Sequence, residues 1–383
     1  MDNSDLWSGF TTEQLDRFDA ARKAARDSLI PLAATGEPGR VNRELLKGLG
    51  TSGLLPRLFP SSFGGAQTNG TVSAVELCLL REALAGVSTE AETALALQGL
   101  GAYPILQSGQ DEVRRRWIPD VARGEAVAAF ALTELDAGSD AASLSLSAEK
   151  VSGGFRLTGA KMWISNAPDA DVYTVFARTS PDEGTRGITA FVLPRDTDGV
   201  TGEPLELISA HPIGRLELDG AFVPDGSILG QIDSGFAVAM RTLDLFRPSV
   251  GAFAVGMAQA ALDASVVYAG SRRAFGASIK DFQAISHKLA DMATSIQAGR
   301  LLVYEAASAH DAGRRVTKAA AMAKLFATEM AQEVIDAAIQ IHGARALERG
   351  HLLEHLYRDV RATRIYEGTS EIQREIIARE LYR

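Results

Sequence analysis

The period of the hydrophobic pattern changes twice along this chain of 383 residues, and that change limits the folds it can adopt. Up to about residue 125, and again from about residue 231, apolar residues recur at the spacing of helices. Between these segments the period is two, in short runs separated by Gly, Pro and Asp, as in β-strands. We therefore predict an α+β protein with a helical domain at 1–125, a small β-barrel or sandwich at 126–230, and a helical bundle at 231–383.

Individual elements follow from the same patterns. Thr11-Thr12-Glu13-Gln14 is expected to open the first helix. Further helices are expected at 45–49, 75–85, 92–107, 235–271, 285–311 and 316–342, the longest of them interrupted by Pro248. Strands are expected at 155–158, 172–177, 187–193 and 216–223.

Composition argues against several classes of protein. The net charge of −9 offers no basic stripe to a nucleic acid. The single cysteine, Cys78, lies in a Leu-rich segment, so we expect it to be buried and expect neither disulfides nor Cys-based zinc sites. His351 and His355 have helical spacing, but no acidic third ligand is obvious, and no metal site is expected.

The start of the chain and its apolar runs bear on its location. The first ten residues, MDNSDLWSGF, have neither a basic start nor an apolar run, so no signal peptide is expected. No stretch approaches about 18 uninterrupted apolar residues, so no membrane span is expected. We therefore expect a cytoplasmic protein.

A stretch near the end of the chain, Arg364-Ile365-Tyr366-Glu367-Gly368-Thr369-Ser370-Glu371-Ile372-Gln373, has the composition of a junction between two helices. Gly368 permits a tight turn, and Ser370 with Gln373 has the spacing of a capping box. Glu367 is therefore expected at a break, where a side chain can point into a cavity. A carboxylate in an apolar cavity has a raised pKa and can accept a proton. From spacing alone, a solvated glutamate beside a helix start is the commoner case.

This junction, preceded by Arg358-Asp359 and followed by Ala378-Arg379-Glu380, resembles the C-terminal signature of the acyl-CoA dehydrogenase family. The resemblance extends over nearly the whole chain. It implies an N-terminal helical domain, a middle β domain and a C-terminal antiparallel four-helix bundle. It also implies a catalytic base (Glu367), substrate contacts (Tyr366 and Gly368) and contacts to the cofactor FAD (Thr369 and Glu371).

Two stretches of the β segment resemble the family's flavin motifs. The run 131–140, ALTELDAGSD, resembles a Thr-Glu-x-x-x-Gly-Ser-Asp loop with Leu135 in place of the usual Pro, although its Gly-Ser-Asp tip alone reads as a turn. The run 161–166, KMWISN, matches the next motif, with Ser165 where Thr is common; alone, its Trp would more often be a core aromatic. The resemblance implies flavin contacts from Leu132, Thr133, Ser139, Trp163 and Ser165, with Ser139 also near the thioester and Ser165 toward the reactive flavin nitrogen.

Two stretches of the last segment complete the implied cofactor site. Arg272-Arg273 before Phe275-Gly276 resembles the family's Arg-x-x-Phe-Gly segment, although a basic pair at a helix end is usually only a dipole partner. In relatives this segment reaches the flavin of a neighbouring subunit, which implies a homo-oligomer, either a dimer or a homotetramer. The implied FAD contacts are Arg272, at the pyrophosphate, with Phe275, Gln283, Gln340 and Gly343.

Three departures from the family pattern bear on the substrate and the cofactor. Where relatives that bind coenzyme A carry a longer Arg-x-Ser-x-Thr loop, this chain has only the run 211–215, HPIGR, so a carrier-protein pantetheine arm is an alternative to coenzyme A. Ala344 and Ala346 replace two glycines, and their Cβ atoms would push back a close phosphate or adenosine. Phe246 stands where some relatives place their base, which leaves that role to Glu367; the neighbouring Asp244 and Arg247 are expected to contact the substrate's pantetheine portion.

The resemblance therefore implies FAD-dependent α,β-dehydrogenation of an acyl thioester, acyl-CoA to enoyl-CoA, in fatty acid metabolism. Glu367 would remove the α-proton, FAD would accept the β-hydride, and an electron-transfer flavoprotein would reoxidise the cofactor. Three alternatives stay open: an acyl-carrier-protein thioester dehydrogenase of a biosynthetic pathway, a flavin oxidase or oxygenase of the same fold, and a non-catalytic thioester-binding protein on the same scaffold.

Overall fold

The computed structural model describes residues 9–68, 70–181 and 183–383, so most of the segment considered for a signal peptide lies outside the described residues. The chain forms two compact units. The helical unit comprises Met1–Asp27, described from residue 9, with Ser73–Glu92 and Asp244–Arg383. The sheet unit comprises Ser28–Val72 and Thr93–Leu243. The division into three domains at residues 125 and 230 remains a prediction.

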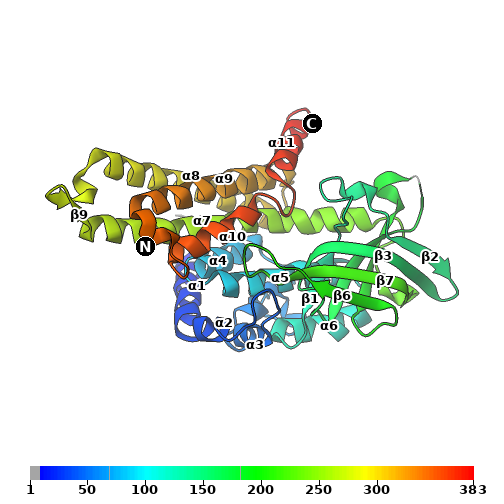
Figure 1. Cartoon of the computed structure of the whole chain (residues 1–383). Helices are drawn as coiled ribbons and strands as arrows, with labels where there is room; N and C mark the ends of the chain where they lie inside the picture. The colour runs from blue at the N-terminus through cyan, green and yellow to red at the C-terminus, as the bar shows by residue number, and fades with distance from the viewer. Residues whose placement is uncertain (1–8, 69, 182) are drawn as a thin grey trace. The chain divides into compact units, whose positions relative to one another are not determined.

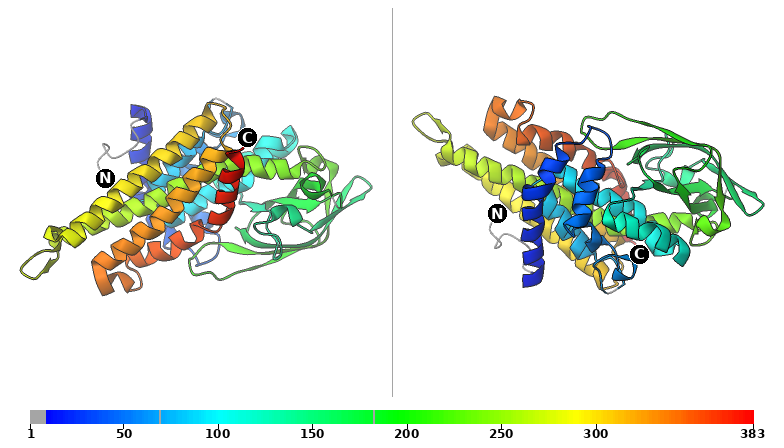
Figure 2. Two further views of the ribbon diagram at one scale, coloured as in Figure 1. Left: turned by 90° about the horizontal axis from the view of Figure 1, so that it is seen from above. Right: turned by 90° about the horizontal axis from the view of Figure 1, so that it is seen from below.

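Long Ala-rich helices build the helical unit. It contains α1 (Thr12–Ala24), α4 (Ala74–Ala85), most of α7 (Gly235–Ser271), α8 (Gln283–Asp311), α9 (Thr317–His342), α10 (Leu352–Thr363) and α11 (Ser370–Glu380). Figures 1 and 2 show α8 and α9 side by side. The small side chains of Ala320, Ala323 and Ala327 in α9 are fully buried, which lets neighbouring helices pack closely. The predicted helical character of the C-terminal region is confirmed.

Helix α7 has the predicted bounds, but the expected interruption at Pro248 was wrong, because the helix continues through it. Proline removes one backbone N–H, yet the fully buried Val250, Ala252 and Ala254 that follow hold the helix in place. Within the described residues, α7 is the one helix long and apolar enough to cross a membrane, with a mean hydropathy of 1.5. The protein itself buries 72% of that apolar window, as expected for a core helix.

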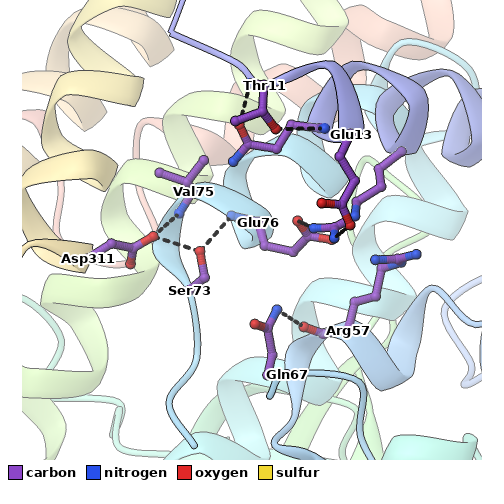
Figure 3. Close-up of polar contacts among 10 residues, drawn as sticks. Thr11, Glu13, Arg57, Gln67, Ser73, Val75, Glu76 and Asp311 are labelled. Carbon is purple, nitrogen blue, oxygen red and sulfur yellow. Dashed lines mark hydrogen bonds and ion pairs between the residues drawn. The ribbon is translucent and has the colours of Figure 1, made fainter. Parts of the chain in front are cut away.

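The start of α4 is tied to the end of α8 (Figure 3). Asp311 accepts hydrogen bonds from the Ser73 hydroxyl at 2.6 Å and from the backbone N–H groups of Ala74 at 2.7 Å and Val75 at 3.1 Å. Burial alone would raise the pKa of Asp311, but hydrogen bonds to its carboxylate hold the pKa below the usual value. One carboxylate therefore accepts hydrogen bonds from backbone N–H groups that have no partner within the helix, and it links two helices.

A single sheet dominates the other unit. It consists of β1 (Ala128–Ala131), β2 (Ser147–Val151), β3 (Gly154–Ser165), β4 (Val172–Arg178), β5 (Ile188–Pro194), β6 (Val200–Pro204), β7 (Ile213–Pro224) and β8 (Ile228–Leu229). The strand order is β6-β7-β3-β2-β4-β5-β8, with β1 parallel to β4. The predicted strands correspond to β3, β4, β5 and β7. Strands β4 and β5 are buried on both faces, which explains their continuous apolar runs.

Among the described residues, the α-helices that belong wholly or mainly to the sheet unit are α2 (Ile30–Ala33), α3 (Arg43–Thr51), α5 (Thr89–Ser108) and α6 (Asp111–Arg123). Helix α5 lies directly against β1. The Gln98 amide donates to the carbonyl of Ala126 at 2.7 Å and accepts from the N–H of Ala128 at 2.8 Å. A Cβ at Gly101 would lie 2.5 Å from the nitrogen of Ala129, so this close approach requires glycine.

Candidate active site

Glu367 lies in the turn between α10 and α11. Its φ is 54° and that of Gly368 is 92°, so a non-glycine residue is held in the left-handed region at a cost of about 1–2 kcal/mol. The dihedral angle of Gly368 favours glycine, and a Cβ there would lie 2.7 Å from Nε2 of Gln373 and displace that amide. The predicted break between two helices is therefore present, and its backbone is strained at Glu367.

Three side chains hold this turn through its two carbonyl groups. Nε of Arg247 donates to the carbonyl of Glu367 at 3.2 Å. Nε2 of Gln373 donates to the carbonyls of Glu367 at 3.1 Å and Gly368 at 2.9 Å. Nζ of Lys324 donates to the Gly368 carbonyl at 2.8 Å. These bonds from α7, α9 and α11 explain how the strained conformation is maintained.

The carboxylate of Glu367 is placed to take up a proton. Its Oε2 atom is buried and has no hydrogen-bond partner among the residues that the structure describes. Burial raises the pKa of Glu367, whereas the charges of Arg81, Arg247 and Lys324 oppose that rise. The alternative of a solvated glutamate is not what the structure shows.

The cap of α11 differs from the prediction. Thr369, not Ser370, is the N-cap residue, and its hydroxyl accepts from the N–H of Ile372 at 3.3 Å. Ser370 instead donates to the carboxylate of Glu329, and Gln373 reaches the carbonyls of the turn. The expected pairing of Ser370 with Gln373 as a capping box was therefore wrong, because each has a tertiary partner that sequence spacing cannot reveal.

Three further residues of the predicted site lie around the same turn. Asp244 accepts a hydrogen bond from the Thr317 hydroxyl at 3.0 Å and lies 3.5 Å from Nη1 of Arg247. Burial raises the pKa of Asp244, although Arg247 opposes the shift. Tyr366 precedes Glu367 directly, and Glu371, which is expected at the cofactor, lies exposed in the first turn of α11. Contacts of these residues with substrate or cofactor remain predictions.

In the sheet unit, the loop after β1 is fastened to β3 next to the expected flavin residues. The N–H of Met162 donates to the carbonyl of Thr133 at 2.9 Å. Nζ of the buried Lys161 donates to the carbonyl of Leu132 at 3.0 Å and to Glu134 at 2.8 Å. Burial lowers the pKa of Lys161 to about 8, with the carboxylate of Glu134 opposing that shift. The loop and strand are thus joined by one buried ion pair.

Trp163 and Ser165 occupy the end of β3, and Ser139 is exposed at the tip of the loop. The pairing of β3 with β7 shifts between Lys161 and Ile164, and within this irregularity Trp163 has a φ of 54°. Its ring is 44% exposed, so the alternative of a core aromatic is wrong. The Ser165 hydroxyl lies 2.7 Å from Nε2 of His211. The structure therefore brings Leu132, Thr133, Trp163 and Ser165 to one end of β3.

A second group of expected cofactor residues lies at one end of the helical unit. Between α7 and α8, the short strands β9 (Arg273–Ala274) and β10 (Ala277–Ser278) form a hairpin that projects beyond both helices (Figure 2). Arg272, Phe275 and Gln283 are exposed there. Nearby in the fold, the rings of Tyr268 and His342 stack at 4.3 Å, which joins the end of α7 to the end of α9.

Gln340 in the last turn of α9 and Gly343 just after the helix are both exposed. Gly343 has a φ of 65°, a conformation that suits glycine. Of the two alanines that depart from the family pattern, Ala344 is exposed and Ala346 is fully buried. The Cβ atom of Ala346 therefore packs inside the protein, and only that of Ala344 faces outward.

Sequence reasoning missed two residues of the site. Lys324 is fully buried in α9, surrounded in sequence by alanines of an apolar face. A lone lysine on such a face is the signal that could have identified it, because a charge is rarely buried without a partner. His211 had been considered only as part of a loop, and its contact with Ser165 joins positions 46 residues apart.

Comparisons with known proteins agree with this fold. The acyl-CoA dehydrogenase N-terminal domain matches residues 11–125, the middle domain residues 129–221 and the C-terminal domain residues 233–382. An acyl-CoA dehydrogenase of Bacillus subtilis (strain 168) is 39% identical over 376 residues, which cover 97% of this chain and 98% of that protein.

Solved structures extend the similarity. Butyryl-CoA dehydrogenase from Megasphaera elsdenii has a TM-score of 0.93 at 34% identity and covers 99% of this chain and 100% of its own. The prolyl acyl carrier protein oxidase AnaB has a TM-score of 0.91 at 27% identity, over 97% of this chain and 100% of its own. The predicted α+β fold and the predicted family are confirmed: the chain belongs to the acyl-CoA dehydrogenase family, whose members are FAD-dependent oxidoreductases.

Proposed function

We propose that this protein oxidises the Cα–Cβ bond of an acyl thioester, with Glu367 as the base that removes the α-proton. The observation that carries this proposal is the buried Oε2 atom of Glu367, which lacks a hydrogen-bond partner in the described part of the chain. A buried carboxylate without a donor is a poor structural element, because its desolvation is not offset by a hydrogen bond. It is a suitable proton acceptor once a substrate lies beside it.

The residues of the sheet unit fit a flavin. The exposed indole of Trp163 offers a flat apolar surface, and the hydroxyls of Thr133 and Ser165 offer polar groups at the same end of β3. A planar ring system with polar edges needs this combination. In the helical unit, the exposed Arg272 has the planar donor fork that suits a pyrophosphate. Bound FAD would supply the acceptor for the β-hydride.

The protein's own groups must keep Glu367 ionised and in place. The charges of Arg81, Arg247 and Lys324 favour its carboxylate form and oppose the effect of burial. The bonds from Arg247, Gln373 and Lys324 to the turn fix the direction of the side chain. We further propose that the backbone N–H of Glu367 donates to the thioester oxygen, where negative charge develops as the α-proton leaves.

Coenzyme A is the carrier that we propose first, because the family and its butyryl-CoA member use acyl-CoA substrates. An acyl-carrier-protein thioester is the second candidate, with either a dehydrogenase or an oxidase outcome. The similarity to a prolyl acyl carrier protein oxidase over 97% of this chain favours this candidate. The run 211–215, which lacks the Arg-x-Ser-x-Thr pattern, favours it as well.

Several further features of the family are proposed for this chain. We propose a homo-oligomer, dimer or tetramer, in which the hairpin at Phe275 meets a neighbouring subunit, and an electron-transfer flavoprotein as acceptor. A role in fatty acid metabolism and a cytoplasmic location belong to the same proposal. The three family matches, at 11–125, 129–221 and 233–382, support a division into three domains.

The test is anaerobic bleaching of the flavin absorbance by acyl thioesters. A panel of acyl-CoAs and the matching acyl-carrier-protein thioesters would be titrated into the purified holoenzyme, with Glu367→Gln and Glu375→Gln as variants. Because Glu375 is exposed in the neighbouring helix, its variant is a matched control. We expect bleaching by the wild type and by Glu375→Gln, and a loss of roughly 10³-fold or more in Glu367→Gln.

Other outcomes would redirect the proposal. Bleaching at the wild-type rate in Glu367→Gln would remove this residue from the reaction. A yellow protein that no thioester bleaches would point to another flavin chemistry. The preferred half of the panel would identify the carrier, and rapid reoxidation by O2 would favour an oxidase.

A further inference from the structure

The contact between Ser165 and His211 is built into the sheet. Ser165 is the last residue of β3 and pairs with Ile213 at the start of β7. The next backbone bond, from the N–H of Asn166 to the carbonyl of Pro212, has a length of 2.8 Å. This ladder brings His211 beside Ser165, and the Oγ to Nε2 distance is 2.7 Å. The imidazole therefore lies where the strand pairing places it.

We propose that His211 is a positioning residue that fixes the direction of the Ser165 hydroxyl and thereby sets the reduction potential of the bound flavin. This inference rests on the proposed function, in which Ser165 faces the flavin at the exposed end of β3. It concerns a histidine to which the proposed reaction assigns no role. The expectation that Ser165 contacts the reactive flavin nitrogen gives the pair its chemical meaning.

The argument is one of donors and acceptors. A serine hydroxyl has one proton to donate and lone pairs that accept. If Nε2 of His211 accepts that proton, the Ser165 oxygen can only accept from the cofactor, which favours the reduced flavin because its reactive nitrogen bears a hydrogen. If Nε2 donates to Ser165, the hydroxyl proton is free to point at the cofactor, which favours the oxidised flavin. Either tautomer biases the redox equilibrium, and without His211 the hydroxyl can rotate.

The size of the effect follows from one neutral hydrogen bond, about 0.5–1.5 kcal/mol. This corresponds to roughly a two- to tenfold change in the ratio of affinities for the two redox forms, or about 10–30 mV for a two-electron couple. The sign of the shift reports the tautomer. A lower potential after removal of the imidazole means that Nε2 accepts, and a higher one means that it donates.

The experiment measures the midpoint potential, the visible spectrum and the dissociation constant of FAD in the holoenzyme. The variants are His211→Phe, Ser165→Ala and the double variant, with His211→Gln to restore a polar group near the Nε2 position. Ser147→Ala is the matched control, because its hydroxyl lies in the same sheet and bonds to the carbonyl of Thr158 at 3.2 Å. His211→Asn replaces His211→Phe if the latter does not fold.

We expect His211→Phe and Ser165→Ala each to shift the potential by the amount above and the double variant to shift it no further, because the two residues act as one unit. His211→Gln should restore most of the wild-type value, and Ser147→Ala should leave it unchanged. An unchanged potential in His211→Phe and His211→Asn, additive shifts, or an equal shift in Ser147→Ala would each overturn the inference.

The two proposals fail in different ways. If thioester bleaching needs Glu367 and the midpoint potential does not change in the His211 variants, this inference alone is overturned. A potential that responds jointly to His211 and Ser165 in a protein that no thioester bleaches would overturn the proposed reaction and leave this inference standing. A protein that cannot be loaded with FAD would overturn both.

Discussion

A buried ammonium group next to the proposed base is unusual at the scale of single residues. Lys324 is fully buried, and its Nζ donates to the carbonyl of Gly368 at 2.8 Å. Burial lowers the pKa of Lys324 to about 8, although the charge of Glu367 opposes that shift. A buried ammonium group would destabilise the protein if it had no hydrogen bond or opposite charge near it. Its retention is explained if it both holds the strained turn and keeps Glu367 ionised.

The activity should therefore fall on the alkaline side of pH 8. As the pH rises through about 8, Lys324 loses its charge. Its hydrogen bond to the Gly368 carbonyl then weakens, and the turn that carries Glu367 is held less firmly. The loss of this opposing charge also raises the pKa of Glu367. In Lys324→Met, the acidic limb of the pH profile should move upward, and the rate of thioester bleaching should fall by roughly 10- to 100-fold. In Lys324→Arg, which stays charged, the alkaline fall should move to higher pH.

Pre-steady-state bleaching rates between pH 5 and 10 measure these profiles. Lys318→Met is the control, because Lys318 is exposed on the same helix. The melting temperature of each variant separates a fold defect from a change in the site. A pH profile of Lys324→Met that coincides with that of the wild type would refute the role assigned to Lys324.

At the scale of elements, one carboxylate ties the start of α4 to the end of α8. Asp311 caps α4 from the far end of α8, and its pKa lies below the usual value. A depressed carboxyl pKa adds stability above the unfolded-state value, near 3.8, and this contribution is lost as the pH falls through the folded-state value. Asp311→Ala should therefore destabilise the protein by about 1–2 kcal/mol near neutral pH.

Urea denaturation of the wild type and of Asp311→Ala at several pH values tests this contribution to stability. The difference in the free energy of unfolding between the two proteins should narrow as the pH falls below about 3.8. Asp281→Ala, which removes an exposed carboxylate before α8, should leave the midpoint unchanged. A constant difference at all pH values would show that Asp311 acts through packing rather than charge.

Elements differ in how far the sequence predicts them. Helix α7 was predicted with its bounds because 37 residues of apolar helical pattern leave no alternative, and buried packing carried it through Pro248. Strands β1, β2, β6 and β8 were missed because they have two to five residues each, too few to establish a period. The N-cap of α11 is Thr369, one residue before the predicted Ser370, because the hydroxyl of Ser370 donates to Glu329 on another helix.

The candidate site shows the same limit. The resemblance of local motifs indicated Glu367, Trp163 and Ser165, because each lies in a contiguous signature. The groups that hold them come from distant positions: Lys324 is 44 residues from Gly368, and His211 is 46 from Ser165. Hydrogen bonds between such positions depend on the packing of whole elements, which no local pattern encodes.

At the scale of the whole molecule, one exposed ring argues for a partner. Phe275, on the hairpin between α7 and α8, is 99% exposed and has a φ of 50°, a strained value for a bulky residue. Its ring contacts that of Phe282 edge-on, with the ring centroids 6.3 Å apart. Burying a phenylalanine against another surface gains about 1.5–3 kcal/mol. A strained backbone that presents such a ring to solvent is explained if a second subunit with its cofactor covers it.

Replacing this ring should therefore weaken both FAD retention and assembly. In Phe275→Asp, we expect the dissociation constant of FAD to rise by about tenfold or more, since the loss of about 1.5–3 kcal/mol corresponds to that factor. The sedimentation mass should shift toward smaller species at low protein concentration. Tyr382→Asp is the matched control, because that ring is 93% exposed in the same unit but lies at the chain end, away from the hairpin. If both variants have the FAD affinity and the sedimentation mass of the wild type, the hairpin does not reach a neighbouring cofactor. If Phe275→Asp alone loses FAD and its sedimentation mass is unchanged, the ring covers a cofactor but does not hold the assembly together.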